Sequence, residues 1–210
     1  MRERGGRERT LMKLGATSFL THRVELGGML FVDACTGFND LIRLEILWNV
    51  RHCCPVGGIF SFKCYKHWAQ ILIRQPGDPS VMILSREGVT QGDLLSIVLC
   101  GIPLALLVED LQAVEPGLLT QFYAYDALFI ISLWRRAQLL NILIDRGSDW
   151  GYFPEPSKSL FIADSPEQGK AENREFAVEK INLYFVGGSR YLGAYIGHRG
   201  YFKAWVKPNM

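Results

Sequence analysis

The sequence predicts an α+β fold in which an antiparallel sheet carries its helices packed on one face. Short apolar runs of strand length are mixed with two or three longer segments of helical periodicity. Several connections between the expected strands are short enough to be hairpins. The chain has 210 residues, 49% hydrophobic and 21% charged, so it can form one domain with a sizeable core and is not composed like a disordered protein.

The first expected elements are a strand and a helix. Residues 29–33 form a short apolar run that ends on Asp33, as a buried strand does, and Gly37 interrupts it. Residues 38–50 carry apolar side chains at helical spacing. We expect this helix to point Phe38, Leu41, Ile42, Leu44, Leu47 and Trp48 inward, and Asn39, Asp40 and Arg43 outward.

The middle of the chain is predicted to consist of short strands joined by turns. Pro55 and the glycine pair after it predict a turn over residues 53–58. Strands are expected at residues 59–65 and 69–74, although the second segment also fits a helix. The sequence QPGDPS at residues 75–80 is a strong turn signal, and a further strand is expected at residues 81–84.

The second half of the chain predicts two helices and a hairpin. Residues 91–111 include the most apolar segment and are expected to form a buried core helix. Residues 121–132 are predicted to be two strands around a turn at residues 124–126. The remaining expected elements are an amphipathic helix at 135–146, with Leu139, Leu140, Leu143 and Ile144 inward, and short strands at 160–163 and 191–196.

Cysteine usage and the N-terminus favour an intracellular protein of the cytoplasm or nucleus. The five cysteines are odd in number and form no repeated CxxC pattern, which suits reduced, buried or half-exposed thiols. The group His52, Cys53, Cys54, Cys64 and His67 does not have the spacing of common zinc sites. No signal peptide is recognised at the start.

Net charge does not decide whether the protein binds a polynucleotide, whereas hydropathy argues against a membrane segment. The formal net charge of +2 neither supports nor excludes a polynucleotide partner, because net charge does not report a clustered basic face. The longest uncharged run, residues 94–108, has 15 residues and contains a proline. Since about 20 apolar residues are needed to span a bilayer, we expect no membrane segment.

Five segments carry the functional signal of the sequence. They are FVDACTGFN (residues 31–39), SREGVTQGDLLS (85–96), FYAYDALF (122–129), GYFPEPSKS (151–159) and SRYLGAYIG (189–197). In this order they resemble the motifs of retroelement reverse transcriptases, which are RNA-directed DNA polymerases. The resemblance implies a polymerase-palm-like domain over residues 29–197, an N-terminal tail with a remnant of the fingers region over residues 1–28, and a C-terminal tail over residues 198–210.

The resemblance implies a catalytic centre that binds two Mg²⁺ or Mn²⁺ ions. Asp33 matches the first metal-binding aspartate of the family, Asp126 matches the second member of a later aspartate pair, and Lys158 matches a lysine that protonates the departing pyrophosphate. Hard divalent cations prefer carboxylate oxygens, and two metals assist nucleotidyl transfer. Alternatively, Asp33 caps the following helix, and Lys158 is a surface lysine after a turn.

Three further residues match positions that bind nucleotide or template in the family. Phe38 corresponds to an aromatic gate beneath the incoming sugar, although a core phenylalanine is the competing interpretation. Gln91 and Gly92 correspond to the pair that lies against the nascent base pair and the template. Leu94 stands where the family usually has a proline, which is expected to loosen the entry to the helix.

The sequence departs from the family at its principal metal ligand. The family pattern is an aromatic residue, any residue and two aspartates, but here the tetrad is Tyr123, Ala124, Tyr125 and Asp126. A neutral phenol is a poor ligand for Mg²⁺ at pH 7. We therefore expect that Tyr125 impairs catalysis, because it replaces a metal-binding aspartate of the family.

Two functions of different classes follow. One is a reverse-transcriptase-like domain of retrotransposon origin, acting on an RNA template, a DNA primer and deoxynucleoside triphosphates, with doubtful catalytic competence. The other is a non-catalytic RNA-binding or assembly module that retains the palm fold. An unrelated α+β protein with chance matches is a third interpretation, and it requires Asp33 and Asp126 to lie far apart. The oligomeric state is not predicted.

Overall fold

The computed structural model describes residues 27–35, 37–74, 76–77, 79–90, 92–132, 135–163, 183–191, 194–197 and 200–202. Of the predicted features, Gln91 and most of the two expected tails lie outside these residues.

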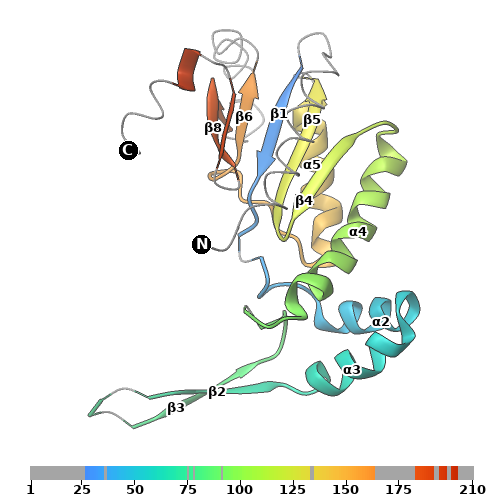
Figure 1. Cartoon of the computed structure of the whole chain (residues 1–210), viewed down its shortest axis with the longest axis vertical. Helices are drawn as coiled ribbons and strands as arrows, with labels where there is room; N and C mark the ends of the chain where they lie inside the picture. The colour runs from blue at the N-terminus through green and yellow to red at the C-terminus, as the bar shows by residue number, and fades with distance from the viewer. Residues whose placement is uncertain are drawn as a thin grey trace, which may run out of the picture.

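A five-stranded sheet forms the centre of the fold (Figure 1). Its spatial order is β4-β5-β1-β6-β7, and every neighbouring pair is antiparallel except β6 and β7, which run parallel. The bounds are β1 Gly27–Val32, β4 Leu119–Tyr123, β5 Asp126–Ser132, β6 Leu160–Ala163 and β7 Tyr184–Val186. The predicted α+β class and the hairpin of β4 and β5 are confirmed.

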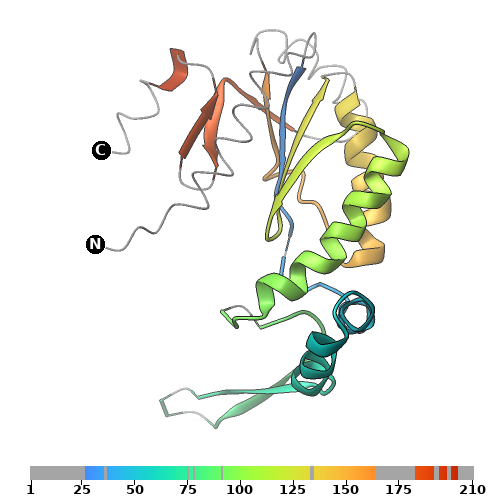
Figure 2. The ribbon, with the colours of Figure 1, turned by 45° about the vertical axis from the view of Figure 1, so that its right-hand side comes forward.

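Helices cover one face of this sheet and a small hairpin lies on the other (Figure 2). The covering helices are α4 (Ser96–Val114) and α5 (Arg136–Gly147), with the short 3-10 helix η2 (Ser148–Trp150) after α5. The hairpin consists of β8 (Gly188–Tyr191) and β9 (Ala194–Gly197). Residues 191–196 were expected as one strand, which is wrong: residue 191 ends one strand and residue 194 begins the next.

The period-2 alternation of β1 and β5 divides the core into two clusters. Leu30, Val32 and Phe129 belong to the larger cluster, which contains the buried residues of α4 and α5. Met29, Phe31 and Leu128 point the opposite way and pack with residues of the β8–β9 hairpin. The two faces of the sheet are therefore both covered along most of its length.

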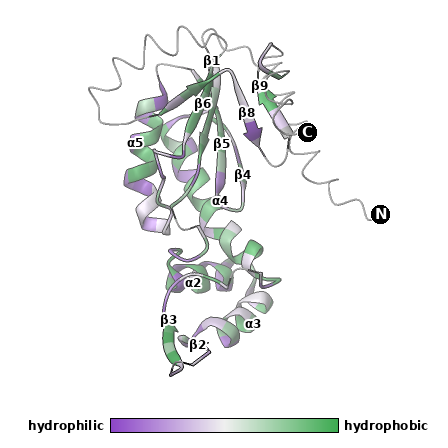
Figure 3. Ribbon diagram, turned by 90° about the vertical axis from the view of Figure 1, so that its left-hand side faces the viewer, coloured by the Kyte–Doolittle hydropathy of each residue, from purple (hydrophilic) through white to green (hydrophobic). Residues whose placement is uncertain are grey.

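A second lobe lies at one end of the sheet (Figure 1). It contains helices α2 (Arg43–Cys53) and α3 (Pro55–Tyr65) and the two-stranded hairpin of β2 (Ala69–Ile73) and β3 (Val81–Ser85). Figure 3 shows the apolar character of this hairpin, whose large side chains are exposed, among them Leu72 and Met82. The strands predicted at residues 69–74 and 81–84 are confirmed.

Helix α3 overturns two predictions. Residues 53–58 were expected as a turn and residues 59–65 as a strand, but residues 55–65 are helical. Pro55 occupies the first turn of the helix, where its missing N–H costs no hydrogen bond. Packing of α3 against α2 then outweighs the glycine pair and the strand preference of the aromatic residues.

The burial of α2 also differs from the prediction. The helix begins at Arg43 rather than at residue 38. Leu44 and Trp48, expected inward, are 76% and 61% exposed, whereas Arg43, expected outward, is 7% exposed. The buried positions of the helix are Arg43, Ile46 and Val50, which are spaced by three and four residues. The spacing of the apolar residues alone did not show which face of the helix packs against the core, because that face includes the charged Arg43.

The cysteines are more exposed than expected. Cys100 is buried, but Cys35, Cys53, Cys54 and Cys64 are exposed, so the prediction of buried or half-exposed thiols is wrong for those four. Among the residues that the structure describes, no group of three or more His, Cys, Asp or Glu side chains is placed to hold a metal ion.

Helix α4 is long and apolar enough to cross a membrane by length and composition alone. Of the most apolar 18 residues of this helix, 33% are buried inside the protein. Leu99, Leu104 and Leu107 are at most 2% exposed in the core, as expected of a helix that packs against a sheet. The core helix of a folded domain passes the same test, so the expectation of no membrane segment stays a prediction.

Candidate active site

The structure brings Asp33 and Asp126 together at one end of the sheet. In the β1–β5 register Val32 lies opposite Ala127. Asp33 directly follows Val32 and Asp126 directly precedes Ala127, so the two acids lie at adjacent ends of neighbouring strands. Asp33 follows Phe31 at the strand period of two, and Asp126 precedes Leu128 in the same way. This proximity is the opposite of what the interpretation as chance matches requires.

The two carboxylates affect each other electrostatically. Burial raises the pKa of Asp126, and the negative charge of Asp33 raises it further. The second effect arises only where two like charges lie close together. A cation between the two groups would remove this repulsion.

Two tyrosines that sequence reasoning did not single out surround Asp126. Tyr152 is 2% exposed, and its hydroxyl donates a hydrogen bond of 3.3 Å to the carbonyl oxygen of Val32. Burial, with the charges of Asp126 and Asp33, raises its pKa well above the ordinary value. Tyr191 also has a raised pKa, through burial and then the charge of Asp126. Both phenols therefore stay neutral beside the acid pair.

Tyr191 lies on the β8–β9 hairpin, close enough to Asp126 for the charge of that carboxylate to affect it. Its ring meets the ring of Phe31 edge-on, with centroids 5.0 Å apart. Its buried hydroxyl has no hydrogen-bond partner among the described residues. The segments GYFPEPSKS and SRYLGAYIG had been singled out, but no sequence pattern distinguished Tyr152 or Tyr191 within them.

Tyr125 is in the turn of the β4–β5 hairpin, and its ring lies against the loop that follows Asp33. Ala124, the residue before it, has a positive φ of 53°, which makes the tight turn between β4 and β5. The Tyr125 ring contacts Phe38 with centroids 5.4 Å apart and planes at 88°. A Cβ atom at Gly37 would lie 2.4 Å from this ring, so only glycine leaves room for it.

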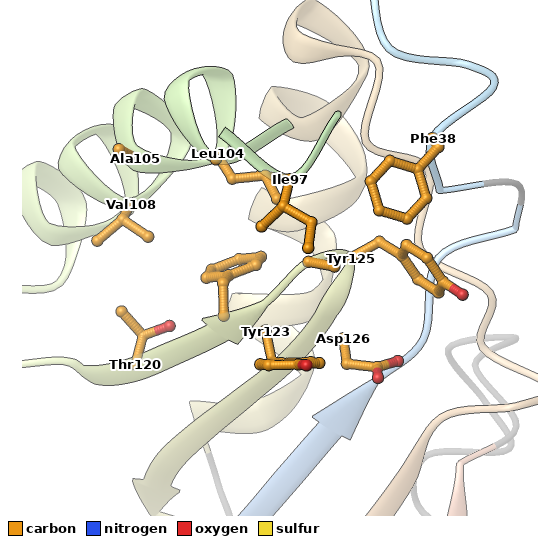
Figure 4. A pocket seen from close by; sticks show the side chains of 12 residues that line it. Phe38, Ile97, Leu104, Ala105, Val108, Thr120, Tyr123, Tyr125 and Asp126 are labelled. Carbon is orange, nitrogen blue, oxygen red and sulfur yellow. The ribbon is translucent and has the colours of Figure 1, made fainter. Parts of the chain in front are cut away.

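Phe38 and Tyr125 close one end of an apolar hollow of about 540 Å³ (Figure 4). Its walls come from α4 and from the β4–β5 hairpin, with Asp126 at the rim. The lining side chains include Ile97, Leu104, Ala105, Val108, Thr120 and Tyr123. Phe38 also packs partly against the core, so its placement fits both the gate and the core interpretation.

The loop before α4 is held to α2 by Arg43. The guanidinium donates hydrogen bonds to the carbonyl oxygens of His67, Ser85, Glu87 and Gly88, at 2.7 to 3.3 Å, and to the Ser85 hydroxyl. The backbone N–H of Val89 donates to the carbonyl of Phe38 at 2.9 Å. The loop that carries Gly92, whose φ is 92°, is thereby fixed relative to the Phe38 segment.

Lys158 belongs to a turn that is bonded to the end of β1. Ala34 and Pro154 form an antiparallel bridge, and the N–H of Glu155 donates to the carbonyl of Asp33 at 2.8 Å. The Lys158 side chain is exposed, and its positive charge acts on Cys35 and Glu155. The structure thus brings Asp33, Asp126, Phe38 and the Lys158 turn to one end of the sheet.

The donor set fits one divalent cation better than two. Mg²⁺ is commonly held by one or two carboxylates together with waters and substrate phosphates, and Asp33 with Asp126 meets that minimum. Position 125, where the resemblance implies a further carboxylate, is a tyrosine. The feature of this site that favours a cation is the placement of two carboxylates at neighbouring strand ends, where burial and then the charge of Asp33 raise the pKa of Asp126.

Comparison with solved structures shows that the fold is palm-like and similar to that of telomerases. Several telomerases are among the solved structures that match. A Candida albicans telomerase matches with a TM-score of 0.62 and 12% identity over 90% of this chain. Candida tropicalis telomerases match with TM-scores of 0.60 and 0.57, at 14% and 13% identity over 94% and 76% of the chain.

These matches concern the fold alone, because the sequences have diverged widely. The chain spans 33%, 39% and 30% of the length of those three telomerases. No protein-family model matches the sequence, and no curated protein matches it. The predicted palm-like fold is confirmed, whereas the roles of the individual site residues remain predictions.

Proposed function

We propose that this chain is a reverse-transcriptase-like domain of the RNA-directed DNA polymerase family, of retrotransposon origin, with impaired nucleotidyl transfer. The observation that carries the proposal is the meeting of Asp33 and Asp126 on the paired strands β1 and β5 of a palm-like sheet. These residues come from two separate sequence motifs, and both carboxylates are expected from the resemblance.

In the proposed reaction Asp33 and Asp126 would hold Mg²⁺ or Mn²⁺. When bound, such an ion lowers the pKa of an attacking hydroxyl and neutralises phosphate charge. Lys158 would donate a proton to the departing pyrophosphate, a role that contributes about 10²–10⁴-fold in general acid catalysis. Phe38 would contact the sugar of the incoming nucleotide, and Gly92 would allow close approach of the backbone.

Tyr125 supports the proposal of impairment. Its ring contacts Phe38 and lies against Gly37, in the segment that follows Asp33, and it brings no carboxylate to that position. Altering the groups around a metal site commonly costs about 10–100-fold in affinity or activity. Loss of a direct anionic ligand is expected to cost more.

Primer extension tests this function directly. The wild type and the Tyr125→Asp variant are compared with an RNA template, a DNA primer and deoxynucleoside triphosphates, in Mg²⁺ and in Mn²⁺, with Tyr125→Phe as the matched control. We expect extension with Tyr125→Asp to exceed that of the wild type, and Tyr125→Phe to remain at wild-type level. Robust synthesis by the wild type would overturn the proposed impairment.

The substitution Asp33→Asn would separate catalysis from RNA binding. Two of the similar telomerases were solved in complex with a TWJ fragment of telomeric RNA, which supports an RNA partner for this chain. Because Tyr125 removes a ligand position while the fold is kept, a non-catalytic RNA-binding or assembly module is the second candidate. It predicts RNA binding that weakens steeply with salt through counterion release, and unchanged binding in Asp33→Asn.

A further inference from the structure

Glu155 connects two parts of the candidate site through its side chain. One carboxylate oxygen, Oε2, accepts a hydrogen bond of 3.1 Å from the thiol of Cys35. The other, Oε1, accepts from both the N–H and the hydroxyl of Ser157. The side chain therefore closes the turn that precedes Lys158 and joins it to the segment that follows Asp33.

The backbone of Glu155 makes the same connection. Its N–H donates to the Asp33 carbonyl at 2.8 Å, and its own carbonyl accepts from the N–H groups of Lys158 and Ser159, at 3.0 and 3.1 Å. The Ser159 hydroxyl donates to the same carbonyl at 2.8 Å, and Ser159 is fully buried. One residue thus has bonds to the strand end that carries Asp33 and to the turn that carries Lys158.

We propose that Glu155 is a positioning residue, whose carboxylate locks the turn of residues 155–159 against Cys35 and so fixes Lys158 relative to Asp33. This inference rests on the proposed function, because it assigns Glu155 a role in placing the lysine that would act as the acid. A surface turn without such a lock leaves a long lysine free to sample many positions.

The electrostatics of the cluster agree with this geometry. The hydrogen bonds from Ser157 and then from Cys35 lower the pKa of Glu155, so the group is a carboxylate at neutral pH. The same contact with Glu155 is the largest cause of the raised pKa of Cys35. Lys158 acts on Cys35 in the opposite direction. Cys35 therefore reports whether the Glu155 carboxylate lies in place.

The first experiment measures the rate at which iodoacetamide alkylates Cys35 at one fixed pH. The exposed Cys53, Cys54 and Cys64 are replaced by serine, and the Cys35 peptide is followed by mass spectrometry. We expect Glu155→Gln to raise the alkylation rate several-fold, because the hydrogen bond from the Cys35 thiol to the carboxylate is lost or weakened. Glu155→Asp keeps the carboxylate but has a shorter reach, so it should give an intermediate rate. An unchanged rate in Glu155→Gln would overturn the contact.

The second experiment measures amide hydrogen exchange over residues 155–159. Glu155→Gln should speed exchange of Ser157, Lys158 and Ser159 several-fold, and Glu155→Asp should restore part of the protection. The paired strands β1 and β5 should exchange as in the wild type. Wild-type exchange of the turn in Glu155→Gln would overturn the locking role.

The third experiment connects the lock to catalysis in the Tyr125→Asp background. Glu155→Gln is expected to lower the turnover of primer extension about 10-fold, with a smaller change in the KM for the nucleotide. Adding Lys158→Ala should then cost little more, because one substitution has already disabled what the other removes. Additive losses would contradict the positioning role. Absence of extension from Tyr125→Asp itself would count against the proposed function, and the first two experiments would still decide the placement of Glu155.

Discussion

The Tyr125 ring meets the ring of Phe38 edge to face, with centroids 5.4 Å apart, directly beside the loop that follows Asp33. Under the proposed function, this contact joins position 125, where a metal ligand is expected, to the residue expected to face the nucleotide sugar. Tyr125 would then change the site by its volume and its contact as well as by its missing charge.

The aromatic contact predicts coupled stabilities for the two positions. Edge-to-face pairs are worth about 0.5–1.5 kcal/mol beyond their buried area. A double-mutant cycle with Tyr125→Leu and Phe38→Leu, measured by urea unfolding, should give a coupling energy in that range. Strictly additive effects would show that the two rings stabilise the fold independently.

Arg43 is predicted to be the most important cation for the stability of α2. Its side chain is 7% exposed and satisfies carbonyl groups of the loop between β3 and α4. Arg43→Ala leaves buried acceptors without donors, which costs about 1–3 kcal/mol for each such group. We expect a loss of at least about 2 kcal/mol in the free energy of unfolding.

Arg51 supplies the matched control for Arg43. It lies in the last turn of the same helix and is exposed. Surface substitutions of this kind usually change the free energy of unfolding by less than about 0.5 kcal/mol. An equal effect of Arg51→Ala and Arg43→Ala would contradict the role assigned to the Arg43 hydrogen bonds.

The acid pair predicts a distinctive pH dependence of stability. Because the pKa of Asp126 is raised in the folded state above its ordinary value of 3.8, the folded state holds a proton that the unfolded state releases. Stability is therefore lost as pH rises through the window above 3.8. Asp126→Asn should unfold at higher urea concentration than the wild type at pH 7, and this advantage should disappear below pH 3.8. A wild-type advantage at pH 7 would contradict the conclusion that the charged Asp126 is unfavourable in the folded state.

The two tyrosines beside Asp126 should respond oppositely to loss of their hydroxyls. Tyr152 donates to the carbonyl of Val32, so Tyr152→Phe should cost about 0.5–1.5 kcal/mol in the free energy of unfolding. Tyr191 has a buried hydroxyl with no partner among the described residues. Tyr191→Phe should be neutral or stabilising, because within the described part of the chain it removes no hydrogen bond of the folded state, and it removes a hydroxyl that is buried there without a partner. Equal destabilisation by both changes, measured by urea unfolding, would show that the Tyr191 hydroxyl is bonded.

The proximity of Asp33 and Asp126 was predictable because each lies in a segment that resembles a motif of the same family. Asp33 ends an apolar strand and Asp126 starts another, and each lies in a recognisable segment. Strand pairing in the register Val32 opposite Ala127 is then sufficient to bring them together. The hairpin of β4 and β5 was predictable because its turn and both strands are contiguous in sequence.

The parts that sequence reasoning missed depend on contacts between distant segments. Arg43 is buried because carbonyls of residues 67–88 surround its guanidinium, and nothing in residues 38–50 indicates their presence. Residues 55–65 are helical because they pack on α2. Tyr191 and Glu155 belong to the site through β8 and through the bridge between Ala34 and Pro154.

Binding of Mn²⁺ tests the central claim most directly, because it needs no template, primer or turnover. Electron paramagnetic resonance titrations of the wild type, Tyr125→Asp, Tyr125→Phe and Asp33→Asn would follow free Mn²⁺. We predict that Tyr125→Asp binds the ion at least about 10-fold more tightly than the wild type, that Tyr125→Phe does not differ from it, and that Asp33→Asn binds more weakly. Equal affinity in all four proteins would contradict the claim that Asp33 and Asp126 form a metal site and that Tyr125 occupies its missing ligand position.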